Sequence, residues 1–254
     1  MTDITLQQVE VFILVFLRVT AIIGSIPVLA NKSVPVRVKG GLSIVTAMLI
    51  TPFVPEYDIP AALLPLVLKM AGEVCIGIII GLTVRFIFSG IQLAGQLIGF
   101  QMGFAIVNVV DPLSSSQVSI ISQFIYILAI LIFFAVNGHH LFLYAIAESY
   151  KILPGFTFQL SGQLIESIVM TAKDIFILAL KIGIPIITLL LLTSVGLGLI
   201  ARTVPQMNIF IVGFPLKIGV GLIGLGLTLQ FMAKALGVVF GSIGTQLKIL
   251  MQLM

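Results

Sequence analysis

The chain has 254 residues, of which 59% are hydrophobic and only 9% are charged, whereas an ordinary soluble domain has roughly 45–50% apolar and about 25% charged residues. This composition excludes a soluble enzyme, a nucleic-acid-binding module and a disordered tail. The net charge of +4 comes from 13 basic and 9 acidic residues scattered singly, so it reflects a shortage of acidic residues and not a basic patch. At about 20 apolar residues per spanning helix, the chain can form about six or seven spans, and we expect one polytopic all-α membrane domain.

The first two apolar runs flank the most basic loop of the chain. They extend over residues 11–30, interrupted by Arg18, and over residues 42–54; the loop between them contains Lys32, Arg37 and Lys39. The positive-inside rule places such a loop in the cytoplasm, so we expect the amino terminus on the other side. The start of the chain lacks the basic region of a cleaved signal peptide, and we expect the first helix to remain in the mature protein.

The next two runs differ in their polar and glycine content. Residues 63–84 are apolar apart from Lys69 and Glu73, which are four residues apart and can therefore neutralise each other on one helix face. Arg85 ends this run. Residues 86–110 mix side-chain amides with glycines, which predicts a second helix with one small stripe and one amide-bearing stripe.

The middle of the chain predicts one long and one short helix. Residues 118–136 contain no charge and form the clearest single span. His139 and His140 follow in a turn, and residues 141–153 form a shorter amphipathic stretch that ends before a Pro-Gly pair.

The last part of the chain predicts two long apolar segments. Residues 164–200 are too many for one ordinary span and contain Pro185, near which we expect one helix to kink and then continue. Residues 202–205 form a turn, and residues 209–240 form the final run.

Charged side chains interrupt several of these runs. A charge at the centre of a bilayer costs roughly 2.5–3.5 kcal/mol even on mild insertion scales. We therefore expect these side chains to face protein or water, which indicates a subunit of an assembly or a pore. They are Arg18, Lys69, Glu73, Lys173, Asp174, Lys181, Lys217 and Lys234.

Glycines four residues apart recur along the chain. Such spacing places glycines on one helix face, where a second backbone can approach closely. Because glycine is common in membrane helices, incidental glycines are the alternative interpretation. The series are Gly77 and Gly81; Gly95, Gly99 and Gly103; and Gly237 and Gly241.

No group of residues predicts catalysis, a cofactor or a metal ion. Adjacent His139 and His140 lack the i, i+4 spacing of a metal-binding helix and indicate a turn or interface. The serines at 114–116 have no GxSxG context and form a polar loop. No GxxxxGK[ST] motif is present, and Cys75 is the single cysteine, so it has no partner in the chain.

Two segments are unusually informative. In Gly99–Pro112 a glycine-rich helix passes through amide groups into an Asp-Pro break, and in Arg202–Pro215 a basic turn with two prolines joins two apolar helices. Both are helix-breaking turns on the simplest interpretation. At membrane depth, however, such breaks are tolerated only where protein buries them or where they line a cavity.

These two segments, together with the helix order and the length, resemble the FliR family, the R subunits of flagellar protein-export gates, whose relatives in virulence systems belong to type III secretion. The resemblance covers essentially the whole chain, is most specific in Arg202–Pro215, and is closer to the flagellar branch. It implies a non-enzymatic subunit of a helical hetero-oligomeric export gate in the bacterial inner membrane, at the flagellar basal body. The implied division is a P-like part at about 1–160 and a Q-like hairpin at about 161–254.

The resemblance also implies partners and a site. The partners are P- and Q-type gate subunits, the B-type switch subunit, the A-type gate subunit, exported flagellar proteins and membrane lipid, without nucleic acid. The loop at about 106–117 is implied to plug the central pore; its residues are Ile106, Val107, Asn108, Val109, Val110, Asp111, Pro112 and Leu113. Helix packing or subunit contacts are expected at Gly95, Gly99, Gly103, Arg202, Pro205, Gln206, Asn208, Gly213 and Pro215.

Two alternatives remain open at this point. A small-solute secondary transporter would bind ions or substrate through Glu73, Asp174 and Lys181 near discontinuous helices, but the chain shows no inverted repeat or acidic relay. A structural membrane scaffold would differ from a gate only in having no channel along its glycine-rich segments.

Overall fold

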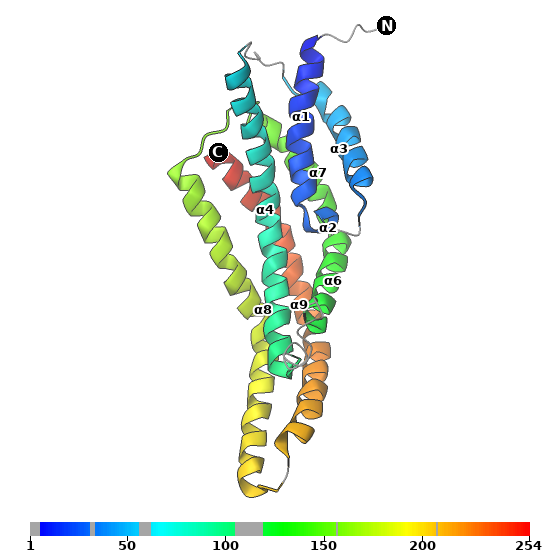
Figure 1. The fold of residues 1–254 in the computed structure, drawn as a ribbon, viewed down its shortest axis with the longest axis vertical. Helices are drawn as coiled ribbons and strands as arrows, with labels where there is room; N and C mark the ends of the chain where they lie inside the picture. Colours follow the sequence, from blue (N-terminus) through cyan, green and yellow to red (C-terminus); the bar gives the residue numbers. More distant parts are fainter. Residues whose placement is uncertain (1–5, 31–33, 56–61, 105–118, 156, 207) are drawn as a thin grey trace. The chain divides into compact units, whose positions relative to one another are not determined.

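The computed structural model describes residues 6–30, 34–55, 62–104, 119–155, 157–206 and 208–254. Every regular element in these ranges is helical (Figure 1). In chain order they are α1 Leu6–Ser25, α2 Pro27–Ala30, α3 Val36–Ile50, the 3-10 helix η1 Thr51–Phe53, α4 Leu63–Met102, α6 Ile120–Ala135, α7 Gly138–Ile152, α8 Gly162–Thr203 and α9 Ile209–Leu253. The chain is therefore an all-α polytopic protein, as its composition predicts.

The number of candidate spans is slightly lower than the composition suggests. Within the described ranges, five helices are long and apolar enough to cross a membrane, or six if α6 and α7 count as one broken span. The difference arises in α4, because the two runs that the sequence separates at Arg85 form one helix of 40 residues. Arg85 is exposed, and a long cationic side chain that reaches the surface does not interrupt helical hydrogen bonding. The predicted helix boundary at Arg85 is therefore wrong.

Other helix ends also differ from the prediction. His139 and His140 do not lie in the turn but in the first turn of α7, where their rings are 4.2 Å apart. Asn137 makes the turn instead, with a left-handed φ of 56°. Helix α8 continues through Pro185 as predicted, whereas α9 extends beyond the predicted end at residue 240 to Leu253.

The chain forms two compact units, each assembled from segments that are distant in the sequence. Unit 1 consists of residues 1–86, 137–171 and 241–254, and unit 2 of residues 87–136 and 172–240. Helices α4, α8 and α9 contribute residues to both units.

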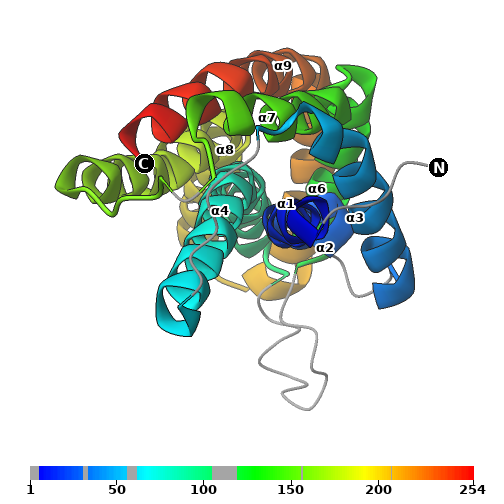
Figure 2. The same ribbon diagram turned by 90° about the horizontal axis from the view of Figure 1, so that it is seen from above.

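Unit 1 is built around α1. This helix contacts α3, which lies beside it in both views (Figures 1 and 2), and its buried face includes Val15, Val19 and Ile22. Gly77 and Gly81 of α4 also lie against it: a Cβ added to Gly77 would be 2.5 Å from the Cβ of Ala21, and one added to Gly81 would clash with Ser25. Small residues thus permit close approach of the α1 and α4 backbones.

Unit 2 has an aromatic core. Phe88 of α4, Phe133 of α6 and Phe240 of α9 are at most 2% exposed. Their ring centroids are 5.3–5.8 Å apart, the separation at which aromatic pairs attract beyond simple burial. The same unit contains the α8–α9 hairpin, yellow to orange in Figure 1.

Candidate functional site

The glycine face of α4 in unit 2 lies directly on α6. A Cβ added to Gly95 would be 2.5 Å from the Cα of Ser122, and one added to Gly99 would clash with Ser119. The Ser122 hydroxyl donates a hydrogen bond of 2.9 Å to the carbonyl of Gln92. The two backbones are therefore close and are linked by a polar bond across the helix pair.

The carboxyl end of α4 is a Schellman motif. Gly103 has a φ of +99°, its N–H donates to the carbonyl of Phe100, and the N–H of Phe104 donates to the carbonyl of Gly99, both at 3.1 Å. This pattern satisfies the last carbonyls of a helix and favours glycine. A ring carbon of Phe214 in α9 lies 2.6 Å from the position that a Cβ on Gly103 would occupy. Helix α4 is thus ended by hydrogen bonding and by packing against α9.

The predicted pore loop follows this helix end. Residues 106–117, including Ile106, Val107, Asn108, Val109, Val110, Asp111, Pro112 and Leu113, lie outside the described residues. Their role as a plug stays a prediction.

The predicted turn over Arg202–Pro215 is too long, because Arg202 belongs to the last turn of α8 and α9 already begins at Ile209 and continues through Pro215. Most of the second predicted set is exposed. Arg202, Pro205, Gln206, Asn208 and Pro215 are exposed, whereas Gly213 is buried. The carbonyl of Asn208 accepts from the N–H groups of Ile211 at 3.1 Å and Val212 at 3.3 Å, so it opens α9. Whether these residues and Gly95, Gly99 and Gly103 serve a subunit interface stays a prediction.

Unit 1 contains a buried ion pair that the sequence analysis missed. The Nε of Arg18 on α1 donates to Oε2 of Glu73 on α4 at 2.6 Å, and the two side chains are 0% and 1% exposed. Helical spacing indicates only Lys69 as a partner for Glu73. An arginine in an apolar run was the available signal, but its partner is 55 residues away and cannot be found from helical spacing.

The same guanidinium also binds the end of α7. Nη1 of Arg18 donates to the carbonyls of Leu153 at 3.1 Å and Ser149 at 3.2 Å, and to the Ser149 hydroxyl at 3.2 Å. Its Cζ lies 4.1 Å from the ring centroid of Tyr150. A cation at a helix carboxyl end meets otherwise unsatisfied carbonyls and the negative end of the helix dipole. Arg18 therefore joins α1, α4 and α7.

The residue set of the transporter alternative does not form a site in either unit. Glu73 is engaged by Arg18 in unit 1, while Asp174 and Lys181 are exposed residues of α8 in unit 2. Among the described residues, no group of three or more histidine, cysteine or acidic side chains could hold a metal ion.

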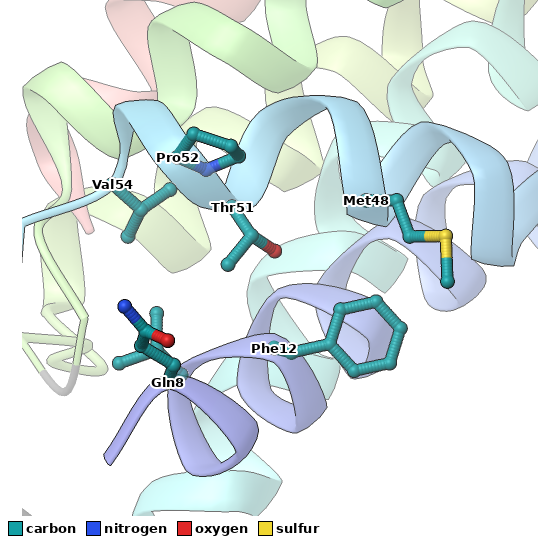
Figure 3. Close-up of a pocket in the computed structure, with 7 residues that line it drawn as sticks. Gln8, Phe12, Met48, Thr51, Pro52 and Val54 are labelled. Atoms are coloured by element: carbon teal, nitrogen blue, oxygen red, sulfur yellow. The ribbon is translucent and has the colours of Figure 1, made fainter. Parts of the chain in front are cut away.

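One pocket of about 380 Å³ lies between α1 and the end of α3 in unit 1 (Figure 3). Its walls are mainly apolar, and its polar side chains are Gln8 and Thr51, whose hydroxyl donates to the carbonyl of Ala47 at 2.7 Å. The lining offers no acid, base or nucleophilic pair for chemistry. It consists of Gln8, Val11, Phe12, Met48, Thr51, Pro52 and Val54.

These features define a class: a polytopic helical membrane protein whose helices approach through glycines and enclose an ion pair. The family model described as "Bacterial export proteins, family 1" matches residues 9–243. The chain belongs to this family.

Its curated relatives include flagellar biosynthetic proteins named FliR. The chain is 35% identical over 221 residues to FliR of Bacillus subtilis strain 168, covering 84% of this chain and 83% of the relative. It is 34% identical over 217 residues to FliR of Pectobacterium carotovorum, covering 85% and 83%, and 34% identical over 206 residues to FliR of Escherichia coli K12, covering 81% and 79%. The resemblance to the FliR family is thus confirmed.

Proposed function

We propose that this chain is a FliR-type component of the flagellar export apparatus, embedded in the bacterial inner membrane and without enzymatic activity. The observation that supports this most strongly is the 34–35% identity to FliR proteins over about four fifths of both chains. The membrane-spanning character of five or six helices agrees with it. Because no phosphate-binding motif occurs in the sequence, the energy for export would come from a separate ATPase or from the proton gradient.

The proposal includes P- and Q-type subunits as direct partners in a helical gate, with B- and A-type subunits attached to it. Exposed apolar surface supports such contacts: only 33% of the apolar window in α8 and 22% of that in α9 is buried within the chain. Surface of this extent requires lipid or other protein against it. The P-like part at about 1–160 and the Q-like hairpin at about 161–254 belong to the same proposal.

The first experiment is to tag the carboxyl terminus, purify the protein gently from native membranes and determine its partners and intact mass by native mass spectrometry. One large complex that holds P- and Q-type subunits with a single copy of this chain is the expected result. A monomer or homo-oligomer without them would overturn the proposal and give priority to transport assays on Glu73 and Asp174.

The proposal further assigns gating to residues 106–117, which would close the channel until an unfolded flagellar protein enters. Val109 and Val110 suit a dry constriction, and Asp111-Pro112 breaks the helix. Deletion of the segment should make the assembled complex leak small ions in proteoliposomes. Unchanged ion leakage would exclude the plug.

A cross-linking experiment separates a pore from a closed scaffold. Cys75 is the single cysteine of the chain and is exposed, so it is first replaced by serine. A new cysteine at Val109 should then cross-link to a stalled export substrate, whereas a control cysteine at the exposed Thr203 should not. No substrate adduct at Val109 would favour the scaffold.

A further inference from the structure

Helix α9 has two contrasting faces within unit 2. One face is buried: Leu225, Met232, Leu236 and Phe240 are at most 4% exposed, and Gly221 of the same helix lies against Met102 of α4. These buried positions recur at helical spacing and form the inner side of the unit.

The opposite face is an exposed apolar stripe with one cation in it. Ile223, Leu227, Phe231 and Val238 are 64%, 79%, 56% and 76% exposed, and the exposed Lys234 lies between the last two. Steps of three and four residues keep all five on one line along the helix. Extended back to Leu216, which is also exposed, the stripe is about 33 Å long at 1.5 Å per residue.

Among the residues that the structure describes, no carboxylate pairs with this cation. The structure records no ion pair or hydrogen bond for the Lys234 side chain with the described residues. Moreover, no Asp or Glu follows Asp174 in the sequence, although Lys181, Arg202, Lys217, Lys234 and Lys248 do. An ammonium in an exposed apolar stripe of a candidate span is costly unless it is paired. Charge complementarity therefore indicates an external acidic group.

Open glycines beside the stripe indicate that the occupant is a helix. A Cβ added to Gly219, Gly226 or Gly237 would meet nothing within 4 Å. Their separations of seven and eleven residues place them on one line along an edge of the stripe. Close approach of two helix backbones makes use of such a line, whereas lipid tails gain nothing from it.

We propose that this face of α9 docks an apolar helix of another subunit, and that an Asp or Glu of that helix pairs with Lys234. The inference rests on the proposed function, since the partner would belong to the export apparatus. It adds the chemistry of the contact: an apolar helix with one carboxylate at its centre.

The test compares four variants in cells that make all other flagellar proteins: Lys234→Met, Lys234→Arg, Lys234→Glu and, as the matched control, Lys248→Met. Lys248 is exposed on the same helix, near its carboxyl end. The readout is the fraction of the chain in the high-mass complex on native gels of solubilised membranes. Expression without the other subunits reports the membrane level of each variant alone, so that a folding defect is seen separately.

Lys234→Met should reduce the complex about tenfold or more, because it leaves the partner's carboxylate buried and unpaired. Lys234→Glu should reduce it further, and Lys234→Arg and Lys248→Met should assemble as wild type. Replacement of an Asp or Glu by Lys in a helix of another subunit should restore assembly of the Lys234→Glu variant. This rescue identifies the partner helix, and it can be interpreted even if the variants differ in membrane level.

Two outcomes would contradict the inference in distinguishable ways. If the Lys234→Met variant assembles as well as wild type or better, the stripe faces lipid. This outcome overturns the docking site but not the proposed function. A wild-type chain that is absent from any complex with other flagellar subunits overturns the proposed function and the docking site with it.

Discussion

Units 1 and 2 differ in how the charged side chains within their apolar helices are bonded. In unit 1, Arg18 and Glu73 are sealed from solvent, bonded to each other, and connected to the end of α7. In unit 2, Lys173, Lys181, Lys217 and Lys234 belong to α8 and α9, and the structure gives these side chains no ion pair with the described residues. The buried pair of unit 1 is bonded within the chain, whereas these lysines of α8 and α9 have no ion pair among the described residues.

A charge in an apolar run can therefore have either of two roles. A partner far away in the same chain makes the charge a stability element, since breaking a buried pair costs about 3–5 kcal/mol. A charge on an exposed apolar face of a candidate span needs a partner outside its own helix, so its removal should affect the assembly more than the fold of the chain. The same sequence signal therefore has two meanings, which mutagenesis can separate.

The largest effect should follow from breaking the buried pair. Glu73→Ala leaves the guanidinium of Arg18 buried without its carboxylate and should destabilise unit 1 by about 3–5 kcal/mol. The measurement is the midpoint of thermal unfolding of the detergent-solubilised chain. Lys181→Met, on the exposed surface of unit 2, should leave that midpoint unchanged.

The double variant Arg18→Met, Glu73→Met sharpens this result. It removes both charges together and should cost less than Glu73→Ala alone, because no uncompensated ion remains. A double variant as unstable as the sum of the two single variants would show that the pair itself contributes nothing.

A smaller effect is expected where α1 and α4 meet. Gly77→Val would place methyl groups against Ala21 and the Arg18 carbonyl, which lie 2.5 and 2.7 Å from the position of a Cβ, and should cost about 1–3 kcal/mol. The matched control is Gly196→Val on α8, where a Cβ meets nothing within 4 Å. Equal membrane levels and equal unfolding midpoints for the two variants would contradict the close α1–α4 contact.

An effect of similar size should come from the end of α4 in unit 2. Gly103→Ala forces a methyl group into a left-handed turn and against Phe214, at a cost of about 1–3 kcal/mol. Gly103→Ala, Phe214→Ala should recover the steric part of the loss but not the strain in φ. If Gly103→Ala unfolds at the wild-type midpoint, the helix does not end in the conformation described above.

Local sequence signals predict much of the fold. The uncharged run at 118–136 corresponds to α6 Ile120–Ala135, and the prolines and glycines near residue 154 mark the end of α7 at Ile152. Both predictions depend on local backbone preferences. The boundary at Arg85 is wrong because a charge interrupts an apolar run but not the hydrogen bonding of a helix, so α4 continues through this exposed side chain.

The site is less accessible to sequence reasoning. The Arg18–Glu73 pair joins residues on different helices, and no spacing rule connects positions 55 residues apart. The glycine spacing predicts close contacts but not the helix that each glycine contacts. In the structure Gly77 lies against α1, Gly95 against α6 and Gly103 against α9. Those assignments depend on the path of the whole chain.

The three-helix contact of Arg18 has a consequence for biosynthesis. Arg18 is made 135 residues before its acceptor Leu153, so at synthesis rates of about 5–20 residues per second its guanidinium is without the end of α7 for roughly 7–27 seconds. Until Glu73 is made, 55 residues after Arg18, α1 holds an unpaired cation, which disfavours its release into lipid. The first helix made therefore acquires its full set of Arg18 contacts only after α7 has been made.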